Sequence, residues 1–185
     1  MTGKAICLFC GSRAGESEGY RALAESVGRA IGERGATMVY GGGALGLMGI
    51  ASNAAIDAGG TVTGIIPNFL RSLEVENPRL TRAIVTDNMF DRKQAMLDLS
   101  DGFLILPGGL GTFDELFEVL TWRQLGQIDK PIVLLSDSGY WEPYVALIEH
   151  VIREGFAGSG VRSLYTVVGT IEDAFAALGL DETAA

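Results

Sequence analysis

The sequence is short of several residue types that particular classes of protein require. Its 14 Lys and Arg are outnumbered by 23 Asp and Glu, for a net charge of −9 at pH 7. Affinity for a nucleic-acid backbone comes mainly from Lys and Arg, so nucleic acid is not an expected partner. The single histidine, His150, has no second histidine with which to form a metal pair, and its spacing fits no Ser-His-Asp triad. We expect no metal and a structural role for His150.

Long apolar runs are also missing. No run approaches the roughly 18 to 20 residues that span a membrane, and the first residues lack the pattern of a signal peptide. We therefore expect a cytoplasmic protein that does not bind membranes. Cys7 and Cys10 are the only cysteines. Three residues apart in an extended run, they face opposite sides of a strand with Cα atoms roughly 10 Å apart, which predicts buried, unpaired thiols.

Short apolar runs alternate with helical patterns along the chain. The runs, typical of strands buried on both faces, are 5–10, 37–40, 62–66, 83–86, 102–106, 132–135 and 165–168. The helical patterns are 18–34, 47–58, 90–99, 112–125, 141–153 and 171–178. This order predicts an α/β fold: one Rossmann-like open parallel sheet with helices on both faces, in a single domain over residues 1–185 with a frayed tail from about 179.

Glycine is abundant, with 26 residues, about twice the usual share of roughly 7%. Three Gly-rich loops follow strands, at 11–13, 41–46 and 107–112. Because ligands bind outside the carboxyl ends of parallel strands, we expect these loops to face one cleft. The stretch 67–82 breaks the alternation and is predicted to be a loop or flap.

The loop Gly41-x-Gly43-x-x-Gly46 matches the dinucleotide fingerprint between a strand and a helix. A nicotinamide site also needs an acid at the end of the next strand to hold the ribose, and that strand ends Ile65-Ile66-Pro67-Asn68. NAD binding is therefore disfavoured, which leaves a phosphate or nucleotide contact and a purely structural turn as the alternatives.

The run from Pro107 to Glu115 is more specific. Its glycines let backbone amides approach a ligand, and Thr112 is predicted to open a helix whose N-terminus attracts phosphate. Neither this run nor the 41–46 loop is followed by Gly-Lys-Ser/Thr, so ATP hydrolysis is disfavoured. Thr112-x-x-Glu115 is also a capping box. Spacing alone leaves catalysis and capping open for Glu115.

Arg92 and Lys93 fall in the first turn of a helix predicted to be capped by Asp87 or Asn88, where the helix dipole disfavours cations. An anionic ligand would offset that cost. The alternative is ion pairing with Asp87, Asp91 or an acid on the loop.

Several of these motifs together resemble one family, the LOG (Lonely Guy) cytokinin riboside 5′-monophosphate phosphoribohydrolases, whose relatives were often labelled lysine decarboxylases. The resemblance covers residues 5–156. It rests on Phe9-Cys-Gly-Ser12, Val39-Tyr-Gly-Gly-Gly43, Gly46-Leu-Met-Gly49, Arg92-Lys93, Pro107-Gly-Gly-x-Gly-Thr-x-x-Glu115, and Leu120-Thr-Trp-x-Gln-Leu-Gly126 followed by Lys130-Pro131.

The resemblance implies hydrolysis of a nucleoside 5′-monophosphate, such as AMP or an N6-modified AMP, to free base and ribose 5-phosphate without any cofactor. Arg92 and Glu115 match the family's catalytic pair. The matching nucleotide contacts are Glu74, Lys93, Gly109, Leu110, Gly111, Thr112 and Thr121, and Ser12 and Gly43 are expected to line the pocket. The resemblance also implies a homodimer or larger homo-oligomer, with the helix of residues 112–126 near the interface.

The chain departs from the plant-like pattern at Phe90 and Asp91, which replace His-Glu, and at Arg13, which replaces a serine. These changes affect the expected base preference. Two other functions are weighed against hydrolysis: a non-catalytic nucleotide or cofactor carrier on the same fold, and an NAD-dependent oxidoreductase. Retention of both Arg92 and Glu115 favours the enzyme over the carrier.

Overall fold

The computed structural model of the chain describes residues 3–71 and 75–180. The strands are β1 (Ala5–Phe9), β2 (Thr37–Tyr40), β3 (Thr61–Pro67), β4 (Arg82–Thr86), β5 (Gly102–Ile105), β6 (Ile132–Leu135) and β7 (Thr166–Val168). The helices are α1 (Glu18–Glu33), α2 (Gly46–Asp57), α3 (Met89–Asp98), α4 (Leu110–Gln124), α5 (Glu142–Arg153) and α6 (Ile171–Ala177), with short 3-10 turns η1 (Asn68–Leu70) and η2 (Ser159–Leu164). The expected tail falls largely on 181–185, outside the described residues.

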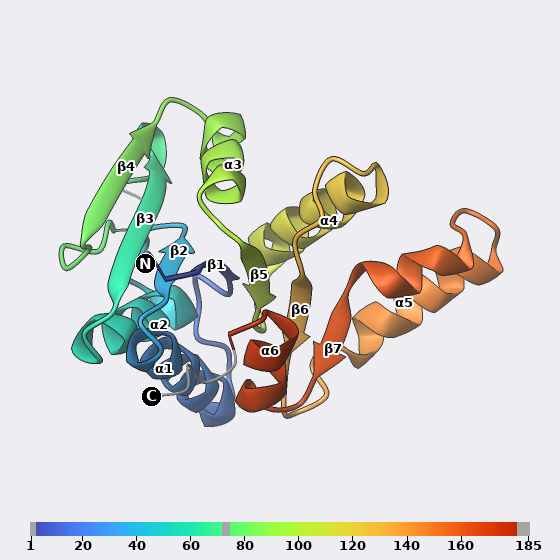
Figure 1. Cartoon of the computed structure of the whole chain (residues 1–185), viewed down its shortest axis with the longest axis horizontal. Coiled ribbons are helices and arrows are strands. Elements are labelled where there is room, and N and C mark those ends of the chain that lie inside the picture. The colour runs from blue at the N-terminus through green and yellow to red at the C-terminus, as the bar shows by residue number, and fades with distance from the viewer. Residues whose placement is uncertain (1–2, 72–74, 181–185) are drawn as a thin grey trace.

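The seven strands form one sheet in the order β4-β3-β2-β1-β5-β6-β7, and every pairing is parallel. This confirms the predicted fold class. From β1 the chain builds outward through β2, β3 and β4, and then crosses back to place β5 on the other side of β1 (Figure 1). The direction of winding therefore reverses between β1 and β5, and the crevice at such a switch point is where open α/β sheets bind ligands.

Each face of the sheet carries its own apolar core, because residues alternate between the two faces along every strand. In β1, Ile6 and Leu8 pack with α1, α2 and α6 on one face, while Cys7 and Phe9 pack with α3, α4 and α5 on the other (Figure 1). Cys10 continues the first set. Both cysteines are buried and free, which confirms the prediction of unpaired thiols on opposite faces.

Local sequence explains where several helices begin. Ser17, Asn88 and Thr170 cap α1, α3 and α6, each accepting a hydrogen bond from a backbone N–H of the first turn. Among residues 3–71 and 75–180, no helix is both long and apolar enough to cross a membrane.

Candidate active site

The loops after β1 and β5 meet at the switch point, where the N–H of Gly11 donates to the carbonyl of Pro107 at 3.1 Å. Two adjoining pockets open there, and they share Ser12, Gly109 and Leu110. The smaller, of about 180 Å³, is lined by Cys10, Ser12, Met48, Leu70, Met89, Arg92, Gly109, Leu110, Gly111, Thr112, Asp114 and Glu115. We call it the Arg–Glu pocket. Loops from opposite sides of the switch point thus build one cleft.

The N-terminus of α4 opens into this cleft. The helix begins at Leu110 with Gly109 as its cap, and its first helical hydrogen bond runs from Phe113 N to Gly109 O at 3.1 Å. The preceding N–H groups, of Leu110, Gly111 and Thr112, have no acceptor within the helix. A Cβ at either Gly109 or Gly111 would meet nothing within 4 Å. These donors can therefore reach an anion.

This start corrects the predicted capping box. Thr112 is the third residue of α4 rather than its cap, and Glu115 is the sixth. A capping-box glutamate must sit at the third helical position to bond back to the cap, so Glu115 cannot play that part. The prediction was wrong because Leu110 and Gly111, lacking a capping side chain, did not resemble a helix start. The capping alternative for Glu115 falls away.

Arg92 reaches the same pocket from α3. Asn88 caps this helix, as one of the two predicted candidates, with its side chain accepting from Asp91 N at 2.9 Å. Arg92 is only 4% exposed. Its Nη2 donates to the carbonyl of Gly41 at 3.3 Å, and its Nη1 lies 3.8 Å from Met89 Sδ. A buried charge is costly unless surrounding groups compensate it, so the guanidinium of Arg92 is held in place by its neighbours at the edge of the pocket.

Lys93, the next residue, points to α4. Its Nζ lies 3.0 Å from Glu118 and 3.2 Å from Asp114. Burial lowers the pKa of Lys93, but hydrogen bonds to Glu118 and Asp114 outweigh it and raise the pKa above its usual value. Lys93 is therefore ion-paired, as the sequence left open, although its partners are on α4 rather than on Asp87 or Asp91.

Cys10 lines the Arg–Glu pocket. Burial, and then the charge of Glu115, raise the pKa of its thiol far above the ordinary value, and the same two causes act on Cys7. Both therefore stay protonated and unreactive at neutral pH. The apolar lining of the pocket, Met48, Leu70 and Met89, was not foreseen, because sequence alone does not separate such residues from core positions.

The N-terminus of α2, by contrast, is filled by the protein itself. The N–H groups of Leu47 and Met48 donate to the carbonyl of Gly11 at 3.0 and 3.3 Å. Gly46 adopts a positive φ of 62°, and a Cβ there would overlap the Ser12 backbone. The carbonyl of Gly43 accepts from the Tyr40 hydroxyl, and Gly43 pairs with Glu76. The dinucleotide-like loop is thus committed to internal packing, which favours the structural alternative.

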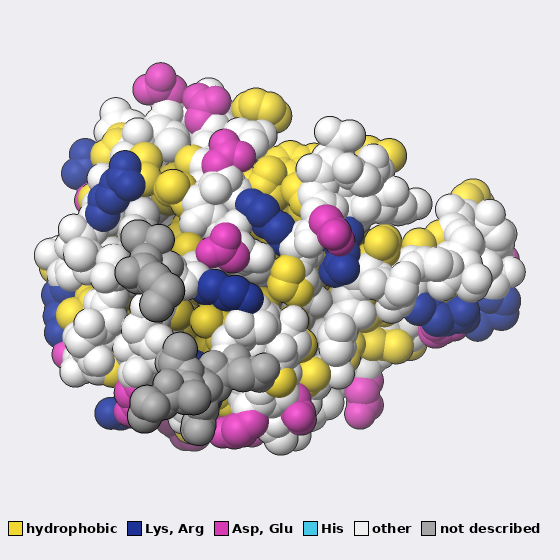
Figure 2. Space-filling model, viewed as in Figure 1, with side chains coloured by type: hydrophobic (Ala, Val, Ile, Leu, Met, Phe, Trp, Pro, Cys, Tyr) yellow, Lys and Arg dark blue, Asp and Glu magenta, His cyan; other side chains and the backbone are white. Residues whose placement is uncertain are grey.

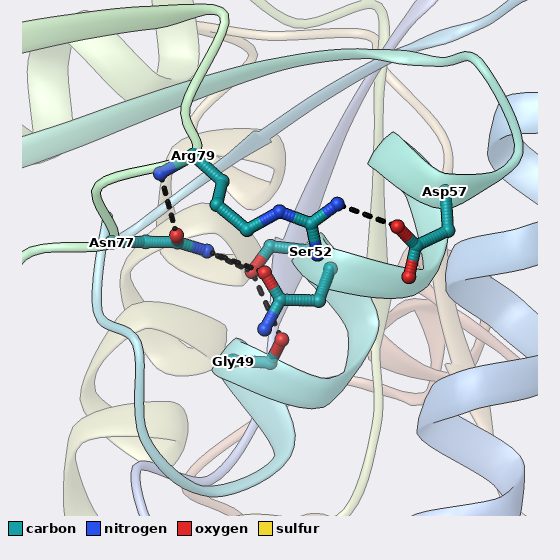
Figure 3. Close-up of polar contacts among 6 residues, drawn as sticks. Gly49, Ser52, Asp57, Asn77 and Arg79 are labelled. Atoms are coloured by element: carbon teal, nitrogen blue, oxygen red, sulfur yellow. Dashed lines mark hydrogen bonds and ion pairs between the residues drawn. The ribbon is translucent and has the colours of Figure 1, made fainter.

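The flap is anchored by a polar network around Asn77 (Figure 3). Asn77 is 3% exposed, and its Nδ2 donates to Ser52 Oγ at 3.0 Å and to Asn53 Oδ1 at 3.2 Å. Its backbone N–H also bonds to Gly42 O at 2.9 Å. Nearby, Arg79 pairs with Asp57 of α2. Glu74, an expected nucleotide contact, lies outside the described residues.

Two further positions lie away from the pocket lining. Thr121 sits 11 residues beyond Leu110 on α4, roughly 16 Å along the helix, and lines a groove with Phe117, Leu147 and Phe156. Phe90 is 66% exposed. This chain therefore brings Ser12, Arg92, Glu115 and the α4 N-terminus together, but not Thr121.

The fold and the cleft define a Rossmann-like α/β protein with an anion-accepting helix end beside a buried arginine and a glutamate. A family model described as possible lysine decarboxylase matches residues 48–178. A cytokinin riboside 5′-monophosphate phosphoribohydrolase of Rhodococcoides fascians is 46% identical over 96% of this chain and 90% of its own. One from Arabidopsis thaliana is 39% identical over 91% of this chain and 78% of its own. The chain belongs to this LOG-type phosphoribohydrolase family.

Solved structures extend the likeness in fold. The Moco carrier protein of Chlamydomonas reinhardtii aligns over 96% of both chains with a TM-score of 0.70 and 24% identity. At that identity, the likeness concerns the fold alone.

Proposed function

We propose that this protein hydrolyses the N-glycosidic bond of a nucleoside 5′-monophosphate, releasing the free base and ribose 5-phosphate. One observation carries the proposal: Arg92 and Glu115 line the same pocket as the open N-terminus of α4. An anion-binding helix end thus lies beside two charged groups suited to glycosidic chemistry. The names of the relatives support the same reaction.

The 5′-phosphate is held by the N–H groups of Leu110, Gly111 and Thr112, with Gly109 and Ser12 at its side. Glu115 lies five residues beyond Leu110, roughly 8 Å along the axis, which is within the span of a ribose 5-phosphate. The phosphate thereby acts as a handle that presents the sugar to Glu115.

In the reaction, the bond between C1′ and the base nitrogen breaks, and its electron pair leaves with the base. The positive charge that develops on the ribose is stabilised by the Glu115 carboxylate, which also orients the attacking water. Water supplies the hydroxyl of the ribose 5-phosphate and the proton that the base gains. Arg92 holds the ribose or base, or assists departure of the base. No metal or cofactor takes part.

A homodimer or larger homo-oligomer is part of the proposal. Around Thr121, apolar side chains are unusually exposed: Phe117 by 41%, Leu147 by 47% and Phe156 by 87%. Such a patch on α4 and α5 is typical of an interaction surface. An interface formed by this patch would place Thr121 of one copy against the partner copy rather than in its own pocket. Size-exclusion chromatography with light scattering measures the number of copies in the assembly.

The proposal includes neither nucleic acid nor a membrane as partner. A net charge of −9, and the mixing of acidic and basic side chains over the face in Figure 2, support this. The free thiols of Cys7 and Cys10 fit a reducing cytoplasm.

The experiment is to incubate purified protein with AMP, N6-isopentenyl-adenosine monophosphate and other monophosphates, and to measure the released base. Release from none of them would refute hydrolysis, and binding without release would favour the carrier alternative. Gln keeps the size of Glu and can still form hydrogen bonds but lacks the carboxylate charge, so Glu115→Gln is expected to keep the melting temperature while lowering kcat at least about 100-fold. Glu33→Gln, an exposed position on α1, is the matched control and should leave both unchanged.

A further inference from the structure

Lys93 lies between the two helices that carry the proposed catalytic pair. It follows Arg92 on α3, and its Nζ contacts Asp114 and Glu118, which flank Glu115 on α4. We infer that Lys93 is a positioning residue that clamps α3 to α4, and so holds Arg92 at its working position relative to Glu115. This inference rests on the proposed function, and it replaces the direct nucleotide contact that resemblance implies.

The geometry of the clamp is specific. Asp114 and Glu118 are four residues apart, so both carboxylates lie on one stripe of α4, and a single ammonium can bond to both. Lys93, Glu115 and Glu118 also line one small cavity, whose apolar lining includes Phe9 and Phe103. The side chain of Lys93 is 18% exposed and that of Glu118 is 23% exposed. The side chain of Lys93 therefore lies beside apolar side chains between the two helices rather than extending into solvent.

Electrostatics argues against a phosphate ligand. One ammonium between two carboxylates offers an incoming dianion little net positive field, and the phosphate would have to displace at least one carboxylate. The raised pKa of Lys93 has the same origin, since the hydrogen bonds to Glu118 and Asp114 overcome the lowering by burial. Lys93 is charged, but Asp114 and Glu118 neutralise its charge within the protein.

A clamp is useful because Arg92 and Glu115 come from two different helices. Arg92 follows the Asn88 cap of α3, and Glu115 follows the Gly109 cap of α4. Glycosidic cleavage depends on both groups meeting the sugar at once, and a misplacement of about 1 Å can cost on the order of 100-fold in rate. Lys93 is adjacent to Arg92, and its partner Asp114 is adjacent to Glu115. The Lys93 clamp therefore fixes the position of Arg92 relative to Glu115.

The test compares Lys93→Met with Glu118→Gln, by steady-state release of base from AMP or whichever monophosphate the wild type hydrolyses. Glu118 does not line the Arg–Glu pocket, so its change reports on the clamp. We expect kcat to fall about tenfold in Lys93→Met and about threefold in Glu118→Gln, with KM within about twofold of wild type. The double variant should be no slower than Lys93→Met, and Lys93→Arg should regain most of the kcat. Lys4→Met, whose Nζ bonds Leu178 O far along the chain, is the matched control.

A direct nucleotide contact gives the opposite pattern. Lys93→Met would then raise KM, and Glu118→Gln would lower KM, because the freed ammonium would bind phosphate better. That pattern overturns the clamp. So does a Glu118→Gln variant with wild-type kcat.

The clamp can fail separately from the proposed function. If the wild type releases no base from any monophosphate, the function fails, and the clamp is then judged by thermal unfolding. Lys93→Met and Glu118→Gln should each lower Tm by about 2 °C, and the double variant should lower it no further. Additive shifts would overturn the clamp.

Discussion

The guanidinium of Arg92 occupies space that a side chain at Gly41, in the loop after β2, would need. A Cβ at Gly41 would overlap Nη2 of Arg92 and lie 3.4 Å from Met48 Sδ. Gly41 has no positive φ, so alanine is allowed by the backbone. We therefore expect Gly41→Ala to act through displacement of the guanidinium alone.

The magnitude follows from what Arg92 loses. Its bond to the Gly41 carbonyl is a hydrogen bond to a charged group, worth about 2 kcal/mol. For a chain of 185 residues, this predicts a fall in Tm of about 4 to 8 °C. A shift of the guanidinium by about 1 Å predicts a loss on the order of 100-fold in kcat/KM.

The assay is base release from a nucleoside monophosphate, with Tm from differential scanning calorimetry. Gly160→Ala is the matched control, because a Cβ there meets nothing within 4 Å, and both quantities should stay unchanged. In an Arg92→Ala background, Gly41→Ala should cost no further activity. Full activity of Gly41→Ala in the wild-type background would show that the space at Gly41 does not set the position of Arg92, and would refute this reasoning.

Two other predictions concern the α4 N-terminus and the two buried cysteines. Gly111→Ala removes a helical glycine, so the free energy of unfolding should stay level or rise by up to about 1 kcal/mol, and Tm should not fall. The added methyl group enters the Arg–Glu pocket and should raise KM at least about tenfold in the same assay. An unchanged KM would place the phosphate elsewhere. Cys7 and Cys10 should resist a thiol reagent at pH 8 in the native protein and both react in denaturant, because burial raises the pKa of both thiols well above the ordinary value. Their stability contribution is then complete below about pH 9 and lost as pH rises further, so Tm should fall above pH 9; native labelling of either thiol would contradict this.

The fold could be predicted because periodicity and burial agree along the chain. Runs such as 102–106 are apolar on both faces, and helices such as α1 carry a capping serine, so local signals and the parallel sheet coincide. Bounds differ by no more than two residues at any strand or helix. The one consequential shift, at Leu110, occurs where the helix has no capping side chain and backbone geometry alone decides its start.

The site was only partly predictable for a physical reason. Charged and glycine residues such as Arg92, Glu115 and Gly109 leave a signal because they are costly in a core or unusual in a helix. Their partners do not: that Lys93 reaches Asp114 and Glu118, or that Arg92 reaches the Gly41 carbonyl, depends on how α3 packs against its neighbours. Such contacts between distant segments have no periodicity to reveal them.

The loops 41–46 and 107–112 show the same limit most sharply, since both lie between a strand and a helix and both are rich in glycine. What separates them is a single carbonyl. Gly11 O accepts from Leu47 and Met48 and so occupies the N-terminus of α2, while Gly11 N bonds to Pro107 O and ties the 107–112 loop to the loop after β1. The N-terminus of α2 is thus filled from within, whereas that of α4 is open. Although the protein has a net charge of −9, it keeps a cluster of open N–H donors at the switch point, beside Arg92, the only buried arginine among the described residues. Under the proposed function, the 5′-phosphate binds at this open N-terminus of α4, on the helix that carries Glu115.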